Sequence, residues 1–242
     1  MKLQTYIQSW ISALNTAVLA LALLAATGCA GVAVKHPTGP VLAPLPPLVT
    51  SGATHYIIRS RPSDIVFLVY RAGPLAAFGH NHVLRASGVH GDVYLNRDFM
   101  LSGFTLSLPL TDLRVDAPAD RAAEGADFAT QPSAAAIAGT LHNMLGPAVL
   151  DAAHYPDIRV RSLWITGSQN AAQVMVRITL HGVERELSVP LALNIDGKLL
   201  SATGHFDIRQ SDFGITPFSI LGGGLRVADT VKVRFHIVAA RE

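Results

Sequence analysis

The 242-residue chain is poor in cysteine and in charge. Cys29 is the only cysteine, so an internal disulfide framework is excluded and no second thiol is available as a nucleophile. Charged residues make up 15% of the chain and the formal net charge is only +2. This balance, without a basic stripe, excludes the electrostatic footprint of a nucleic-acid-binding protein.

The motifs of two common enzyme classes are also missing. No Gly-x-Ser-x-Gly elbow of a serine hydrolase occurs. The glycine run at 222–224 lacks the Lys-Ser/Thr that completes a phosphate-binding loop, so it is interpreted as a flexible hairpin loop. We therefore expect a protein that is not an enzyme and carries no cofactor.

The single cysteine follows an apolar run near the N-terminus. Lys2 is the only charge before it, and a basic start, an apolar core and small residues describe a secretory signal peptide. Ala26-Thr27-Gly28-Cys29 resembles a bacterial lipoprotein lipobox, which implies cleavage before Cys29 and acylation of its sulfur. The alternatives are an ordinary cysteine in a plain signal peptide and a retained transmembrane helix, for which the apolar run is short.

The lipobox divides the chain into three parts. Residues 1–28 are predicted to be a lipoprotein signal peptide, residues 29–52 a Pro/Ala-rich tether and residues 53–242 the folded domain. Ala30 after the cysteine favours the outer membrane, so we expect a lipoprotein on the periplasmic side of a bacterial membrane, held by its N-terminal acyl anchor.

Alternation of apolar and polar residues dominates the folded part. It is clearest at 104–110, 174–180, 187–195 and 231–237, and six more strand-like runs lie at 55–59, 65–71, 80–86, 88–95, 158–166 and 199–208. One alanine-rich stretch lacks alternation, and Ser133 can cap a helix from Ala134 to Leu145 that ends before Gly146-Pro147. The pattern predicts an all-β fold: an extended antiparallel barrel of about eight strands with a short helical insertion.

The tightest histidine pair is His80-Asn81-His82. Residues two apart on a strand share a face, so the two imidazoles could hold a metal, with His90 or Asp92 approaching across a hairpin. A turn followed by polar strand residues explains the pair as well. We therefore predict no metal and keep a His80/His82 site as the alternative.

Several short motifs, in order, resemble the YceI-like family. The most specific is Arg209-Gln-Ser-Asp-Phe-Gly-Ile215, and the others lie at 63–67, 155–162, 178–191 and 229–236, with matching order and spacing from about Thr54 to Ala239. The resemblance implies a lipocalin-like barrel that carries a long isoprenoid or similar amphiphilic lipid. The chain departs from the usual, more basic pattern at Phe78–Leu84, which is interpreted as a subgroup feature.

The expected function is binding of a hydrophobic or isoprenoid-type ligand inside the barrel; a ligand-free structural barrel and a His-based metal protein or metal-dependent enzyme are the alternatives. The oligomeric state does not follow from the sequence, which is compatible with a homodimer. Apolar residues on the alternating strands and nearby loops are predicted to line the cavity: Phe67, Val69, Phe104, Leu106, Leu108, Trp164, Val174, Val176, Ile178, Leu191, Leu193, Phe206, Phe213, Phe218 and Phe235.

Overall fold

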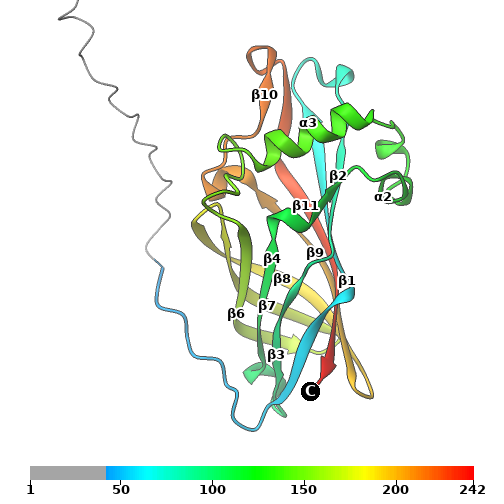
Figure 1. Cartoon of the computed structure of the whole chain (residues 1–242). Helices are drawn as coiled ribbons and strands as arrows, with labels where there is room; N and C mark the ends of the chain where they lie inside the picture. The colour runs from blue at the N-terminus through cyan, green and yellow to red at the C-terminus, as the bar shows by residue number, and fades with distance from the viewer. Residues whose placement is uncertain (1–41) are drawn as a thin grey trace, which may run out of the picture. The chain divides into compact units, whose positions relative to one another are not determined.

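The computed structural model describes residues 42–242 (Figure 1). The predicted signal peptide and Cys29 lie outside the described residues, as does most of the predicted tether. Both therefore stay predictions.

Strands account for most of the described chain. They are β1 (Thr54–Ala72), β2 (His82–Ala86), β3 (His90–Leu95), β4 (Gly103–Pro109), β5 (Leu113–Val115), β6 (Asp157–Ser168), β7 (Ala171–Leu180), β8 (Val183–Asp196), β9 (Leu199–Arg209), β10 (Ser219–Ile220) and β11 (Leu225–Arg241). Within residues 42–242 these eleven form one antiparallel sheet in the order β10-β11-β9-β8-β7-β6-β4-β3-β1-β2-β5. An additional β1–β11 pairing closes eight of them into a barrel, which confirms the predicted fold.

The long strand β1 changes partner along its length. It pairs with β11 on one edge, while its other edge pairs first with β3 and then, from Ile65 to Val69, with β2. The β1–β11 register shifts between Arg59 and Asp64, at the point where the sequence pattern suggested two separate strands. The shift bends one continuous strand, which serves both the eight-stranded barrel and the β1–β2–β5 extension.

Two helices follow β5, α2 (Pro118–Ala123) and α3 (Ala134–Leu145). The predicted helix α3 has its predicted bounds, and the Ser133 hydroxyl accepts a hydrogen bond from the Ala136 N–H at 3.2 Å. It crosses one end of the barrel, close to β2 (Figure 1). No helix in residues 42–242 has the length and apolar character needed to cross a bilayer.

The described part of the predicted tether lies against the barrel. Arg177 donates to the Ala43 carbonyl at 2.7 Å, Arg161 to the Pro46 carbonyl, and Asn96 to the Val49 carbonyl at 2.9 Å. Three side chains from β6, β7 and the end of β3 thus hold this extended segment by its backbone. We call residues 43–49 the docked segment.

Candidate ligand cavity

The inward faces of the barrel strands surround an apolar cavity of about 150 Å³, which we call the barrel lobe. Because side chains alternate between the two faces of a strand, every second side chain points into the barrel, for example Val174, Val176 and Ile178 on β7. Among the residues that line this lobe, Ser102 carries the only polar side chain. Such a surface offers a ligand almost no hydrogen bonds, so it suits hydrocarbon.

A second cavity of about 200 Å³ lies under helix α3, and we call it the helix lobe. Phe67, Ile158, Leu180 and Ile208 line both lobes, so the two adjoin. The helix lobe also has polar side chains in its wall, contributed by Thr140 and Asn143 of α3, His82 of β2 and Gln210. The two lobes therefore run from a purely apolar interior to a region with hydrogen-bonding groups.

The volumes limit what the barrel holds in this conformation. A dry cavity of about 150 Å³ in a protein core accepts one benzene molecule. Two adjoining lobes of about 150 and 200 Å³ thus match two or three five-carbon units, roughly 10–15 carbon atoms. A longer chain needs side chains to move or its remainder to lie outside.

Most of the side chains predicted to line the cavity do so. The lobes are lined by Phe67, Val69, Phe104, Leu106, Leu108, Val174, Val176, Ile178, Leu191, Leu193, Phe206, Phe218 and Phe235. Their position is therefore as expected, whereas their contact with a ligand stays a prediction.

Trp164 is a correction, because its side chain is 51% exposed on the outside of the barrel. The pairing of β6 with β7 shifts register between Ser162 and Trp164. Ser162 is buried before the shift and Ile165 after it, so the alternation changes phase by one residue. A bulge of this kind reverses the predicted direction of every later side chain on the strand.

Phe213 is the other correction. It is 2% exposed and belongs to a packed cluster with Val183 and Ile215, and it lines neither lobe. Its carbonyl accepts a hydrogen bond from His181 at 3.3 Å, in the tautomer that protonates Nδ1. The Ser-Asp-Phe-Gly segment therefore closes the β7–β8 end of the barrel by packing.

Some lining residues were not predicted. Helix α3 supplies Thr140, Asn143 and Met144 to the helix lobe. Met144 follows Ile137 and Leu141 at helical spacing along α3, so this apolar periodicity was the signal that could have identified it. Thr140 and Asn143 gave no such signal, because they face the cavity only as a result of how α3 packs on the barrel.

The histidine pair belongs to a polar cluster beside the helix lobe. The His80 and His82 rings lie 4.6 Å apart, and His82 Nδ1 is 2.7 Å from Asp116 Oδ2. Asp116 Oδ1 accepts from the Val83 N–H at 2.9 Å and from Arg121 at 2.5 Å. The further metal ligands that the sequence suggested, His90 and Asp92, do not join the pair. His90 is exposed, and Asp92 contacts His55. Asp116 is the acidic residue that lies beside the histidine pair instead.

Burial and charge shift two pKa values in this cluster. Burial, helped by the neighbouring His82, lowers the pKa of His80 below its usual 6.5. Burial alone would raise the pKa of Asp116, but hydrogen bonds from His82 and the Val83 N–H outweigh it and hold that pKa below 3.8. At neutral pH the cluster therefore has a neutral His80 beside an ionised Asp116.

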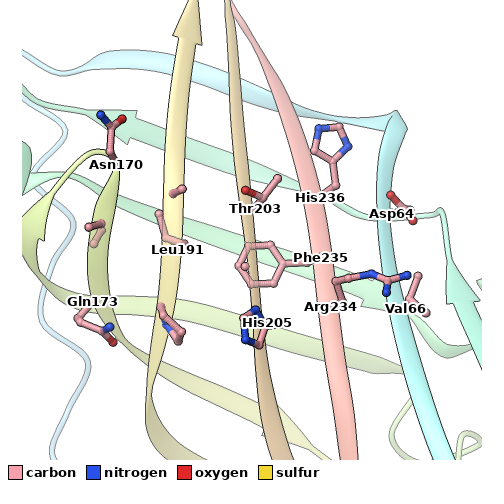
Figure 2. A pocket seen from close by; sticks show the side chains of 15 residues that line it. Asp64, Val66, Asn170, Gln173, Leu191, Thr203, His205, Arg234, Phe235 and His236 are labelled. Atoms are coloured by element: carbon pink, nitrogen blue, oxygen red, sulfur yellow. The ribbon is translucent and has the colours of Figure 1, made fainter. Parts of the chain in front are cut away.

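A larger hollow of about 590 Å³ lies on the outside of the sheet, across β7–β8–β9–β11–β1 (Figure 2). Polar side chains such as Gln173, Thr203, His205 and Arg234 line it. Thr203 and His205 alternate with Ala202 and Phe206 of the barrel lobe, so they face away from it. The hollow is open and mixes these polar side chains with apolar ones such as Val66 and Phe235, so it does not enclose a hydrocarbon ligand as the two lobes do.

A closed antiparallel barrel with an apolar interior defines the class of small barrels that enclose side chains or a ligand. The model of the YceI-like domain matches residues 78–239, and the chain belongs to this family. The family resemblance read from the short motifs is thereby confirmed. None of the curated proteins compared with the chain matches it.

Two solved structures share the fold. BcnA from Burkholderia cenocepacia superposes with a TM-score of 0.56 at 16% identity, over 76% of this chain and 99% of its own. A polyisoprenoid-binding domain from Saccharophagus degradans, implicated in plant cell wall breakdown, gives 0.52 at 13% identity, over 78% and 99%. At these identities the likeness concerns the fold.

Proposed function

We propose that this protein binds an amphiphilic, isoprenoid-type lipid inside the barrel and catalyses no reaction. The observation that carries the proposal is the pair of adjoining lobes, dry in the barrel and polar under α3. The hydrocarbon lies in the barrel lobe, and the polar end lies near Thr140, Asn143 and Gln210. The family membership supports the same class of ligand, as does the description of the Saccharophagus domain as polyisoprenoid-binding.

Desolvation supplies the affinity. Burying about ten methylene-sized groups at about 0.8 kcal/mol each gives a gross gain of roughly 8 kcal/mol. Immobilising the ligand and ordering its chain offset part of that gain. Because the barrel lobe offers little hydrogen bonding, we infer that specificity depends on the length and branching of the hydrocarbon and on the polar groups of the helix lobe.

We further propose that the barrel is tethered to a bacterial membrane through acylated Cys29, on the periplasmic side of the outer membrane. The support is the lipobox-like Ala26-Thr27-Gly28-Cys29 after an apolar run. A carrier of sparingly soluble lipid gains from staying beside a membrane, where its ligand is concentrated.

Filling the barrel lobe tests the proposed ligand site. Val176 is 2% exposed and points into the lobe from the middle of β7. We expect Val176→Trp to occupy the space of the ligand and to lower binding of a short isoprenoid alcohol, such as farnesol, at least tenfold. The measurements are calorimetric titration and mass spectrometry of lipids that copurify with the protein.

Met175→Trp is the matched control, because Met175 is the adjacent residue on β7 and falls on the opposite, outer face. It should bind the lipid as the unmodified protein does. In a packed core without a ligand the Val176 substitution would instead cost about 1–3 kcal/mol through overpacking. Destabilisation of that size, with no lipid bound by either protein, contradicts the proposal.

A further inference from the structure

Two buried side-chain nitrogens of the cluster around the histidine pair lack a hydrogen-bond partner within residues 42–242, Nε2 of His80 and Nη2 of Arg121. Arg121 still donates three hydrogen bonds through its other nitrogens, so His80 is the residue whose burial is unexplained. His82 and Asp116, in contrast, are hydrogen-bonded to each other. A purely structural account thus explains the contact between His82 and Asp116, but leaves the Nε2 atom of His80 unexplained. A buried nitrogen of this kind normally finds a partner.

The fold brings the three side chains together from two segments. His82 is the first residue of β2 and His80 comes two residues before the strand, and their rings lie 4.6 Å apart. β2 pairs with β5, and Asp116 directly follows β5 with a φ of 51°. That turn is fixed by the Asp116 N–H, which donates to the Val83 carbonyl at 2.8 Å.

We propose that His80, His82 and Asp116 form a binding site for one divalent transition-metal ion of the zinc or copper type. One ligand atom from each residue lies within 4.8 Å of the other two. Two imidazole nitrogens and one carboxylate oxygen suit these ions, and three protein ligands leave a position open. The site goes beyond the proposed lipid binding and does not depend on it.

The geometry needs only a small adjustment. Bonds of about 2.0–2.1 Å in a tetrahedral site place ligand atoms roughly 3.3 Å apart. The three ligand atoms lie within 4.8 Å of one another, so the widest separation has to shrink by at most about 1.5 Å, whereas the 2.7 Å between His82 Nδ1 and Asp116 Oδ2 has to widen by about 0.6 Å. Rotation of the side chains would bring about both changes. Asp116 Oδ2 then exchanges its contact with His82 Nδ1 for the ion.

The surroundings of Asp116 fit the role of a metal ligand. Its other oxygen, Oδ1, is held by the Val83 N–H and by Arg121, which fixes the orientation of the carboxylate. Arg121 is fully buried and also donates to the Asn81 and Thr130 carbonyls at 2.7 Å. These carbonyl contacts hold the guanidinium in place, so Oδ2 stays available to the ion.

The test is zinc binding by the untagged full chain, compared with its His80→Gln variant. We expect one zinc per chain by calorimetric titration, and at least a tenfold loss of affinity in His80→Gln. His80→Gln should leave the melting temperature in chelator unchanged, because Nε2 of His80 has no partner to lose. Copper(II) as a second probe should give an electron paramagnetic resonance spectrum with coupling to two imidazole nitrogens.

His90→Gln is the control for adventitious binding, because His90 is exposed and its Nδ1 lies 3.2 Å from the Gly88 carbonyl oxygen, outside the proposed site. It should bind zinc like the unmodified chain. Asp116→Asn should weaken zinc binding as well; should it unfold, His82→Gln replaces it. The proposal is overturned by two outcomes: no stoichiometric zinc in the unmodified chain, or zinc binding that His80→Gln leaves unchanged.

Discussion

At the scale of single residues, His55 joins three parts of the chain. Its Nε2 lies 2.8 Å from Asp92 on β3, and its Nδ1 lies 2.7 Å from Glu242 at the C-terminus. The ring also stacks on Tyr94 at 4.9 Å. The hydrogen bonds with Asp92 and Glu242 raise the pKa of His55 above 6.5. Protonated His55 therefore stabilises the fold more than neutral His55 does.

This pKa shift predicts a pH dependence. A raised pKa in the folded state gives stability that is complete below pH 6.5 and is lost as the pH rises through the folded-state pKa. We expect the unmodified protein to exceed His55→Gln in free energy of unfolding at pH 5.5, by less than about 1 kcal/mol because the site is partly exposed. Urea denaturation at pH 5.5 and 8.5 measures it, and a difference that grows with pH would contradict the assignment.

At the scale of elements, two glycines should respond oppositely to alanine. Gly204 on β9 lies under the Phe235 ring, and a Cβ there would come within 2.3 Å of the Pro190 carbonyl oxygen. Gly139 is inside α3, and a Cβ there meets nothing within 4 Å. Gly204→Ala should lower the free energy of unfolding by about 1–3 kcal/mol, whereas Gly139→Ala should raise it by up to about 1 kcal/mol. Chemical denaturation measures both changes, and equal changes in the free energy of unfolding would show that the space around each glycine does not determine the effect.

The alternating strands and the helix could be predicted because their signals are local. Period-two alternation marks a strand with one buried face wherever it occurs, and Ser133 with Gly146-Pro147 bounds a helix within a dozen residues. Closure into a barrel followed from the number of such strands and the family motifs. The two short strands β5 and β10 had too few residues to show a period.

The parts that could not be predicted depend on contacts between distant segments. A single-residue bulge before Trp164 reverses its direction, and nothing in the alternation of β6 marks where the extra residue falls. Asp116 reaches His82 because β5 pairs with β2, although 34 positions separate the two residues. Sequence spacing alone suggested His90 and Asp92 across a hairpin, but they lie on β3, which β1 separates from β2 in the sheet.

At the scale of the whole molecule, the proposed acyl anchor predicts where the protein resides. Cys29→Ser removes the only thiol in the chain, and with it the site of acylation. We expect the variant to move from the membrane fraction to the soluble periplasmic fraction while its barrel still binds lipid. Fractionation after a high-salt wash measures this, and a variant that stays with the membrane would contradict the anchor.

The docked segment also sets how far such a molecule could travel. A fully extended chain from Cys29 to the first strand would span at most roughly 80 Å, and one from Cys29 to Ala43, where Arg177 holds the backbone, would span at most about 45 Å. Halving the radius of a tethered body shrinks the volume it explores several-fold, and its effective concentration at the bilayer rises accordingly. Three hydrogen bonds from barrel side chains to the backbone of the docked segment would thereby tune how often the cavity meets the membrane.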